Sequence, residues 1–340
     1  MKDEFVEKAR IDESGMLDAV MSLSTQIKKG FDIGVRFSAP EYDSICVTGM
    51  GGSAISGDIL KDLVDLRGKK PVFVNRNYSL PPHVDKKTLL VVISYSGNTE
   101  ETLASFKEGL NRGAHILSIT SGGELKHLSN ENGIHVAEVP AGFQPRAAMG
   151  YLLFSLLGFL SDEIALTKDE VEEVASEVDD TLGSNSPDVP TQENESKSLA
   201  QFLLGKSISI YGVPYLEGAT RRLKCQLNEN SKVIARYELF SETNHNDIVG
   251  WGSQDLKRNS IVILRSREDH PRIEKRVEIT KKLAFGDRVR EVIAPSLALG
   301  DLICLIAKCD LASYYLALLR NVDPTPVEII TRMKKALGGG

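Results

Sequence analysis

Two short loops combine glycine with hydroxyl side chains in a pattern that could bind a phosphate group. The first reads Gly49-Met50-Gly51-Gly52-Ser53, and the second reads Ser94-Tyr95-Ser96-Gly97-Asn98-Thr99. Glycine lets the backbone turn tightly and approach a ligand, and a helix that starts after such a loop presents unpaired N–H groups to an anion. The hydroxyl groups of the second loop surround one glycine and can donate to phosphate oxygens. The residues expected to hold the phosphate are Gly51, Gly52, Ser53, Ser94, Ser96 and Thr99.

Both loops also have ordinary explanations. The first lacks the GxGxxG spacing of dinucleotide-binding loops, and the full GxxxxGK[ST] spacing of a P-loop is absent from the chain. In the second, Asn98 or Thr99 could simply cap the following helix. Capping would account for one or two of its polar side chains but not for all three hydroxyl groups. We therefore expect a phosphate there, with the hydroxyl groups turned away from the neighbouring carboxylates of Glu100 and Glu101.

Outside the loops, four charged residues lie in contexts that could support proton transfer or stabilise charge. Glu229 lies between two asparagines, and His245 lies in the polar run 242–247, where an imidazole that titrates near neutrality could move a proton. Arg146 precedes an apolar helix, where its charge opposes the helix dipole and suggests a ligand or a carboxylate partner. Lys334 lies in the run Arg-Met-Lys-Lys. Taken singly, Glu229, His245 and Lys334 are most simply explained as solvent-exposed side chains.

The histidines and cysteines show no spacing typical of a metal site or a disulfide framework. The six histidines form neither an HxH nor an HExxH pattern, which disfavours a zinc enzyme. The four cysteines are scattered and include no CxxC, so reduced thiols are expected. The sequence therefore predicts neither a metal nor another cofactor.

The composition is that of a soluble globular protein with a mild negative charge. Of the 340 residues, 41% are hydrophobic and 26% charged, and 41 Lys and Arg against 47 Asp and Glu give a net charge of −6. A nucleic-acid binder needs a basic field, and the charged residues 1–10 do not form a signal peptide. The longest apolar run, 147–160, is shorter than the about 20 residues that span a bilayer, and residues 302–319 are interrupted by charges. We expect a cytoplasmic protein with no nucleic-acid or membrane partner.

Short apolar segments alternate with helix-length segments, which indicates parallel sheets with right-handed helical crossovers. Residues 89–93 are continuously apolar, as expected of a central strand that is covered on both faces. The predicted fold class is α/β, with two doubly wound parallel-sheet domains and flanking helices. The expected strands are 45–48, 72–74, 89–94, 116–120, 136–139, 208–211, 233–235, 261–264 and 289–293.

The length fits two domains at roughly 150 residues each. Residues 183–198 contain a single aliphatic side chain, which predicts a linker or exposed loop between them. The predicted parts are an N-terminal helical segment (1–40), a first domain with the phosphate loops (41–160), a helix with the polar linker (161–199), a second domain (200–320) and a C-terminal helix (321–340).

The loop motifs, taken together with motifs further along the chain, resemble the sugar isomerase (SIS) domain. Within that superfamily, the sequence is similar to the bifunctional phosphoglucose/phosphomannose isomerases of archaea and some bacteria. The resemblance extends from about Gly49 to Leu337. Besides the two loops, it rests on Pro145-Arg146-Ala147, Asn228-Glu229-Asn230, His245-Asn246, Asn321-Val322-Asp323-Pro324 and Lys334.

The resemblance implies two flavodoxin-like SIS domains and a metal-free aldose–ketose isomerase that acts on a hexose 6-phosphate. Such an enzyme moves a proton between C1 and C2 through a cis-enediol(ate). By the resemblance, Glu229 shuttles this proton, His245 opens the sugar ring, and Arg146 stabilises the enediolate oxygens. Lys334, rather than Lys335, aligns with the active-site lysine of the family. The resemblance also implies a homodimer, in which His245 can reach the site of the neighbouring subunit.

One position departs from the family pattern. At least some members have a threonine near the start of the last helix, which is proposed to help them accept both C2 epimers. The corresponding residue here is Val327, and Thr325 lies two residues earlier. The sequence therefore supports glucose 6-phosphate more firmly than mannose 6-phosphate as a substrate. The alternatives are a phosphosugar-binding regulator without turnover and an isomerase of another sugar or amino-sugar phosphate.

Overall fold

In the computed structural model, residues 4–37, 40–252 and 258–338 are described. They form two compact units that interleave along the chain, and each is described by itself. One consists of Ser22–Ala175 with Val327–Gly340, and the other of Met1–Met21 with Ser176–Pro326. We call them the loop unit and the base unit, because the first contains both glycine-hydroxyl loops and the second contains Glu229.

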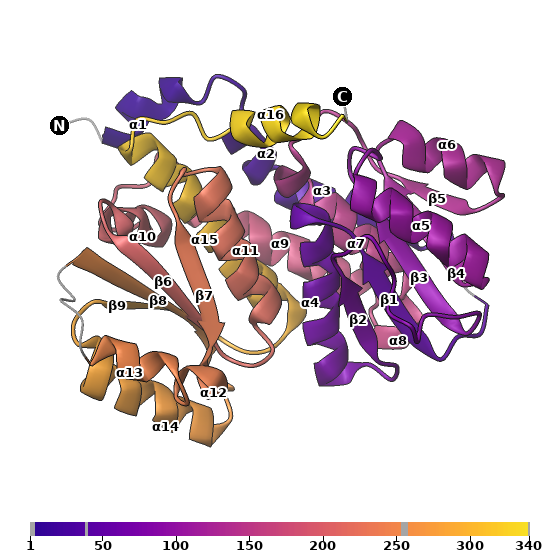
Figure 1. The fold of residues 1–340 in the computed structure, drawn as a ribbon. Helices are drawn as coiled ribbons and strands as arrows, with labels where there is room; N and C mark the ends of the chain where they lie inside the picture. The colour runs from indigo at the N-terminus through magenta and orange to yellow at the C-terminus, as the bar shows by residue number, and fades with distance from the viewer. Residues whose placement is uncertain (1–3, 38–39, 253–257, 339–340) are drawn as a thin grey trace. The chain divides into compact units, whose positions relative to one another are not determined.

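The loop unit is built on a parallel sheet of five strands in the order β2-β1-β3-β4-β5 (Figure 1). The chain reverses its direction of winding between β1 and β3, which lie side by side in the sheet. Open parallel sheets bind ligands at the carboxyl ends of the strands that flank such a point. The strands are β1 (Ser44–Thr48), β2 (Val72–Asn75), β3 (Thr88–Ile93), β4 (His115–Thr120) and β5 (His135–Glu138).

Helices cover both faces of this sheet. Every residue of β3 is buried, as its apolar sequence predicts for a central strand. On one face, Leu90 and Val92 of β3 pack with Phe106 and Leu125 in a hydrophobic core cluster. The helices of the unit are α3 (Leu23–Gly34), α4 (Gly51–Arg67), α5 (Glu100–Arg112), α6 (Gly123–Glu131), η2 (Pro145–Ala147), α7 (Met149–Phe159), α8 (Ser161–Ile164) and α16 (Glu328–Ala336).

The base unit contains a parallel sheet of four strands in the order β7-β6-β8-β9. Its strands are β6 (Ser207–Gly212), β7 (Ala235–Leu239), β8 (Asn259–Ser266) and β9 (Val289–Ala294). Its helical elements are α1 (Glu4–Lys8), η1 (Ala9–Ile11), α2 (Met16–Met21), α10 (Glu195–Leu203), α11 (Glu217–Glu229), α12 (Phe240–Thr243), α13 (Asp247–Trp251), α14 (Pro271–Thr280), η4 (Lys281–Phe285) and α15 (Leu299–Leu319), while α9 (Lys168–Ser184) runs from the loop unit into it.

Helix α15 forms the centre of the base unit. It is long and apolar enough to cross a membrane by composition, but most of its length is buried inside the protein, as in the core helix of a globular domain. Asp310, in its middle, accepts two hydrogen bonds from the guanidinium of Arg222 on α11, Nε at 3.0 Å and Nη2 at 2.6 Å. This buried pair fixes the packing of α11 against α15.

The carboxyl end of β8 is filled by a network of charged side chains. Arg265 is buried and lies 3.1 Å from Asp269 and 3.1 Å from Glu291. Glu278 and Glu274 lie 3.4 and 3.7 Å from the same guanidinium. The base unit therefore has its own charged groups where the loop unit has its hydroxyl-rich loop.

The predicted fold class is confirmed, since both halves are parallel α/β sheets with flanking helices. Two details differ. Strand β7 begins at Ala235 rather than at residue 233. The polar segment 183–198 is only partly a loop, because α9 continues to Ser184 and α10 begins at Glu195. Lys197 is fully buried and donates to the carbonyl oxygens of Pro187 and Val189, both at 2.8 Å, so the polar residues hold this segment in place.

Candidate active site

The sheet order of the loop unit brings the two glycine-hydroxyl loops together. They follow β1 and β3, which are neighbours, so both loops lie at the carboxyl edge of the sheet. A Cβ on Gly49 would lie 2.7 Å from the carbonyl oxygen of Ile93, which requires glycine at this position. The N–H of Tyr95 donates to Oγ of Ser53 over 3.3 Å. Ser53 thus accepts from the second loop and keeps its own hydroxyl proton for another acceptor.

The hydroxyl groups of the second loop are not used for capping the helix that follows. Thr99 is the N-cap of α5, but its side chain makes no capping hydrogen bond. It accepts instead from the hydroxyl of the buried Ser94 over 3.1 Å. Asn98 accepts from the N–H of Glu124, at the start of α6, over 3.0 Å, and its own N–H donates to Oγ of Ser96 over 3.3 Å. The capping explanation for this loop is therefore wrong.

Of the two carboxylates beside this loop, Glu100 accepts a hydrogen bond from Tyr78. The hydroxyl of Tyr78 donates to Oε2 of Glu100 over 3.2 Å. The charge of Glu101 is the first cause that raises the pKa of the exposed Tyr78, with smaller contributions from burial and Glu100. Tyr78 therefore stays a hydrogen-bond donor at neutral pH and holds one of the two acidic groups.

Arg146 lies next to the first loop. It belongs to the short helix η2 and is buried, and a Cβ on Gly52 would lie 3.0 Å from Cα of Arg146 and 3.2 Å from its N atom. The backbone of this arginine therefore packs directly on the start of α4. The structure brings together the two glycine-hydroxyl loops and the backbone of Arg146, although these residues lie up to a hundred positions apart in the sequence.

Tyr95 connects the second loop to the segment that leads to Arg146. Its structural role could not be inferred from the loop motif alone. Its hydroxyl donates to the carbonyl oxygen of Pro140 over 2.9 Å and accepts from the N–H of Phe143 over 2.9 Å. It thus fixes the segment that leads to Arg146. The one feature of the sequence that could have indicated this role is the position of a large aromatic residue in a loop of small residues.

Glu229 is the last residue of α11 and is half-buried. Asn228 accepts from the N–H of Ala235 over 3.2 Å, and Asn230 donates to Oγ of Ser313 on α15 over 2.9 Å. Lys232 donates to the carbonyl oxygens of Glu229 and Pro324, the latter over 3.0 Å. The flanking asparagines thus pin the backbone on both sides of the glutamate, and Lys232 links it to the Asn321–Pro324 motif.

His245 lies in the turn between α12 and α13, and its side chain is exposed. Its N–H donates to the carbonyl oxygen of Glu242 over 2.9 Å. Asn246 donates to Oε1 of Glu242 over 2.6 Å. Glu242 and Asn246 therefore support the turn by bonding to each other.

Glu229 and His245 lie at opposite ends of the sheet of the base unit. Helix α11 starts after the carboxyl end of β6 and returns to the amino edge, where it ends at Glu229 and β7 begins six residues later. His245 comes after the carboxyl end of β7. The five residues of β7 alone span roughly 13 Å. The structure does not bring these two residues of one chain together.

Lys334 and Lys335 both lie on α16, in which no residue is buried. The apolar side chains of this helix are also exposed, Ile329 to 81% and Met333 to 55%. The predicted threonine-equivalent Val327 is the N-cap of α16, and Thr325 is buried just before it.

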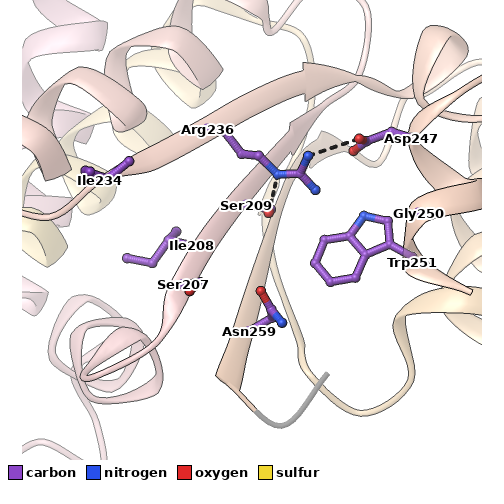
Figure 2. A pocket seen from close by; sticks show the side chains of 9 residues that line it. All are labelled: Ser207, Ile208, Ser209, Ile234, Arg236, Asp247, Gly250, Trp251 and Asn259. Carbon is purple, nitrogen blue, oxygen red and sulfur yellow. Dashed lines mark hydrogen bonds and ion pairs between the residues drawn. The ribbon is translucent and has the colours of Figure 1, made fainter. Parts of the chain in front are cut away.

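A cavity of about 410 Å³ lies on the sheet of the base unit, near the turn of His245 (Figure 2). Figure 2 shows the guanidinium of Arg236 between Ser209 and Asp247, with the indole of Trp251 beside it. None of the predicted site residues lines this cavity. Within residues 4–37, 40–252 and 258–338, no three His, Cys, Asp or Glu side chains gather in a way that could hold a metal ion.

Comparison with known proteins identifies both halves of the chain. Residues 41–145 match the SIS domain, and residues 192–337 match the C-terminal SIS domain of bacterial phospho-glucose isomerase. A crystal structure of a hypothetical protein from Thermus thermophilus superimposes with a TM-score of 0.76 over 99% of this chain and 94% of its own. At 16% identity, it supports the fold alone.

Two curated relatives extend the comparison. D-glucosamine-6-phosphate 4-epimerase from Sulfolobus acidocaldarius is 33% identical over 213 residues, which are 62% of this chain and 65% of its own. The bifunctional phosphoglucose/phosphomannose isomerase of Caldicellulosiruptor bescii is 40% identical over 338 residues, which cover 95% of this chain and 98% of that protein. The chain described here therefore belongs to the bifunctional phosphoglucose/phosphomannose isomerase family.

Proposed function

We propose that the protein interconverts glucose 6-phosphate and fructose 6-phosphate, and also mannose 6-phosphate, through a cis-enediol(ate). The observation that carries this proposal is the loop pair at the winding reversal of the loop unit, in a chain that belongs to this isomerase family. Its hydroxyl groups are oriented by hydrogen bonds within the loop pair rather than used as caps of α5.

The phosphate binds where the two loops meet. The hydroxyls of Ser53, Ser96 and Thr99 each accept a bond from the protein, so their protons can be donated to phosphate oxygens. The first N–H groups of α4, at Gly51 and Gly52, add donors and the positive end of a helix dipole. Ser94 does not need to touch the ligand, because it already donates to Thr99.

The proton between C1 and C2 is carried by Glu229. A general base must be held within hydrogen-bond distance of the proton that it removes, and the bonds from Asn228, Asn230 and Lys232 fix the backbone around this residue. Arg146 supplies a fixed positive charge for the enediolate oxygens, where a guanidinium with two parallel donors fits. Lys334 adds a second cation from α16.

The enzyme works as a homodimer in which each sugar meets residues of two subunits. The ring oxygen is bonded to C1 in the aldose and to C2 in the ketose, so the ring-opening group and the base must act close together on either substrate. Glu229 and His245 of one chain lie beyond opposite ends of β7. His245 therefore opens the ring of the sugar that is bound to the other subunit. We further propose that this chemistry proceeds in the cytoplasm, without a metal or other cofactor.

The test combines substrates with one isosteric variant. Protein treated with a chelator is incubated separately with fructose 6-phosphate and with mannose 6-phosphate, and the products are measured by coupled assays. Both substrates should give glucose 6-phosphate. Glu229→Gln should lower kcat by about 10²-fold or more, the typical contribution of a general base, while the Kd for fructose 6-phosphate stays unchanged. Binding without turnover in the unmodified protein would instead identify a phosphosugar-binding regulator.

A second candidate, an enzyme acting on an amino-sugar phosphate, is favoured by one observation. A relative at 33% identity is named D-glucosamine-6-phosphate 4-epimerase. Incubation with glucosamine 6-phosphate separates the two candidates. Conversion of this compound together with no conversion of fructose 6-phosphate would favour the second.

A further inference from the structure

The turn that carries His245 is held by Asp247 from the sheet of the base unit. Oδ1 of Asp247 accepts from Nη1 of Arg236 on β7 over 3.0 Å, and Oδ2 accepts from the hydroxyl of Tyr211 on β6. Arg236 is held in turn by Oγ of Ser209, which accepts from its Nε over 2.9 Å (Figure 2). A carboxylate two residues after His245 is therefore anchored to two strands.

Tyr211 is buried with its ring against other aromatic side chains. Its ring is 1% exposed and stacks on Phe285 with 5.0 Å between ring centroids. Nε1 of Trp251 donates to the same hydroxyl over 2.6 Å. Burial raises the pKa of Tyr211, so the hydroxyl remains a donor to Asp247 at every physiological pH.

The other side of the turn is held by helix α14. Asn244, the residue before His245, donates to Oγ1 of Thr280 over 2.8 Å and accepts from Nη1 of Arg276 over 3.3 Å. The backbone on both sides of His245 is thus fixed to different elements. The imidazole itself is exposed and has no hydrogen-bond partner within the part of the chain that the structure describes.

In this arrangement, the buried side chains of Tyr211 and Trp251 hold the turn that carries the exposed side chain of His245. A solvated turn needs no such anchor for its own sake, because water satisfies its polar groups. Burying the hydroxyl of Tyr211 and the indole of Trp251 is costly unless both are hydrogen-bonded, and here they are bonded to the group that holds the turn. What the anchor determines is the position of the His245 imidazole.

We propose that Asp247, held by Tyr211 and Arg236, is a positioning residue that fixes His245 for proton transfer at the sugar ring oxygen. This inference rests on the proposed ring-opening function of His245. Without the anchor, the turn samples other conformations, and the imidazole spends less time at the distance that proton transfer requires. Misplacement by about 1 Å can cost up to roughly 10²-fold in rate. The phosphate loops lie on the other unit and are unaffected, so kcat should fall while KM stays unchanged.

The test is a double-mutant cycle between the anchor and the histidine. His245→Ala should lower kcat by about 10²-fold, the typical contribution of a general acid or base. Asp247→Ala should lower kcat by about 10-fold, and Tyr211→Phe, which keeps the ring, by a smaller factor in the same direction. In the His245→Ala background, adding Asp247→Ala or Tyr211→Phe should have no further effect on kcat, because the anchor then has no side chain to position.

A matched control separates positioning from stability. Tyr315 is a buried tyrosine of the same unit whose hydroxyl donates to the carbonyl oxygen of Asn185 over 2.7 Å, away from the turn. Tyr315→Phe should lower Tm as Tyr211→Phe does, but leave kcat unchanged. Equal kcat losses in both tyrosine variants, or additive losses in the double variants, would overturn the inference while leaving the function of His245 intact. Full activity in His245→Ala would overturn both.

Discussion

At the scale of single residues, the hydroxyl groups of the loop unit differ in their hydrogen bonds: three accept and keep a proton to donate, and one donates its proton to another hydroxyl. Ser94 is buried and donates to Thr99, whereas Ser53, Ser96 and Thr99 accept and keep their protons. The sequence showed three hydroxyls around a glycine but could not show this difference. Which hydroxyl donates and which accepts depends on the backbone and side-chain groups that contact the loop in the folded protein.

We expect this division to be visible in substrate affinity. Thr99→Val removes a donor to a charged phosphate, a bond worth about 1.5–3 kcal/mol, and should raise KM by roughly 10-fold or more. Ser94→Ala leaves the donor in place and only loosens it, so KM should rise by a smaller factor. Steady-state kinetics with fructose 6-phosphate measures both values. A larger effect for Ser94→Ala than for Thr99→Val would show that Ser94 is the residue in contact with the phosphate.

At the scale of elements, the parallel sheets could be predicted from the sequence because their strands are short apolar runs. Residues 89–93 predict β3, and the helix that follows this strand, α5, is amphipathic. The polar segment near Lys197 could not be predicted, because its side chains are buried through bonds to distant carbonyls rather than by hydrophobicity. Tyr95 and Asp247 were missed for a similar reason, since their partners lie far away in sequence.

Gly97 of the second loop is required because the backbone at Gly122, which is distant in sequence, packs against it in the folded protein. Gly97 has φ +72, and a Cβ there would fall on the carbonyl oxygen of Gly122 and lie 2.8 Å from its carbonyl carbon. Gly97→Ala should lower the free energy of unfolding by more than the about 1–2 kcal/mol that the left-handed conformation alone costs. Gly133→Ala is the control, because φ is +64 there but no atom lies within 4 Å. Urea unfolding gives both values, and equal losses would show that the loop relaxes around the new side chain.

Helix α16 offers a case in which function and stability should separate. None of its residues is buried, so removal of residues 327–340 should leave Tm unchanged. The same truncation should lower kcat/KM by about 10²-fold or more, because it removes Lys334. In the full chain, Lys334→Ala should lower kcat/KM by about 10²-fold, as expected for the loss of a preorganised charge, and Lys335→Ala should have little effect. The opposite ranking of the two variants would assign the role to Lys335.

At the scale of the whole molecule, the placement of Glu229 and His245 beyond opposite ends of β7 makes a strong prediction about subunits. In a heterodimer of one Glu229→Gln chain and one His245→Ala chain, one of the two sites contains both intact residues and the other contains neither. Heterodimers isolated with two different affinity tags should therefore have about half of the wild-type activity, although each parent homodimer retains only about a hundredth of it. An inactive heterodimer would place both residues in the site of their own chain.

The four strands of the base unit follow the same order as the first four strands of the loop unit, yet the network around Arg265 makes the two carboxyl edges unequal. In the base unit, four carboxylates face a single guanidinium and Lys281, so the local charge is negative and a phosphate would be repelled. The corresponding edge of the loop unit carries uncharged hydroxyls and helix N–H groups. We therefore expect each chain, despite its two similar halves, to bind one phosphate group rather than two. In the proposed mechanism, the base unit repels the anion and contributes Glu229 and His245 instead.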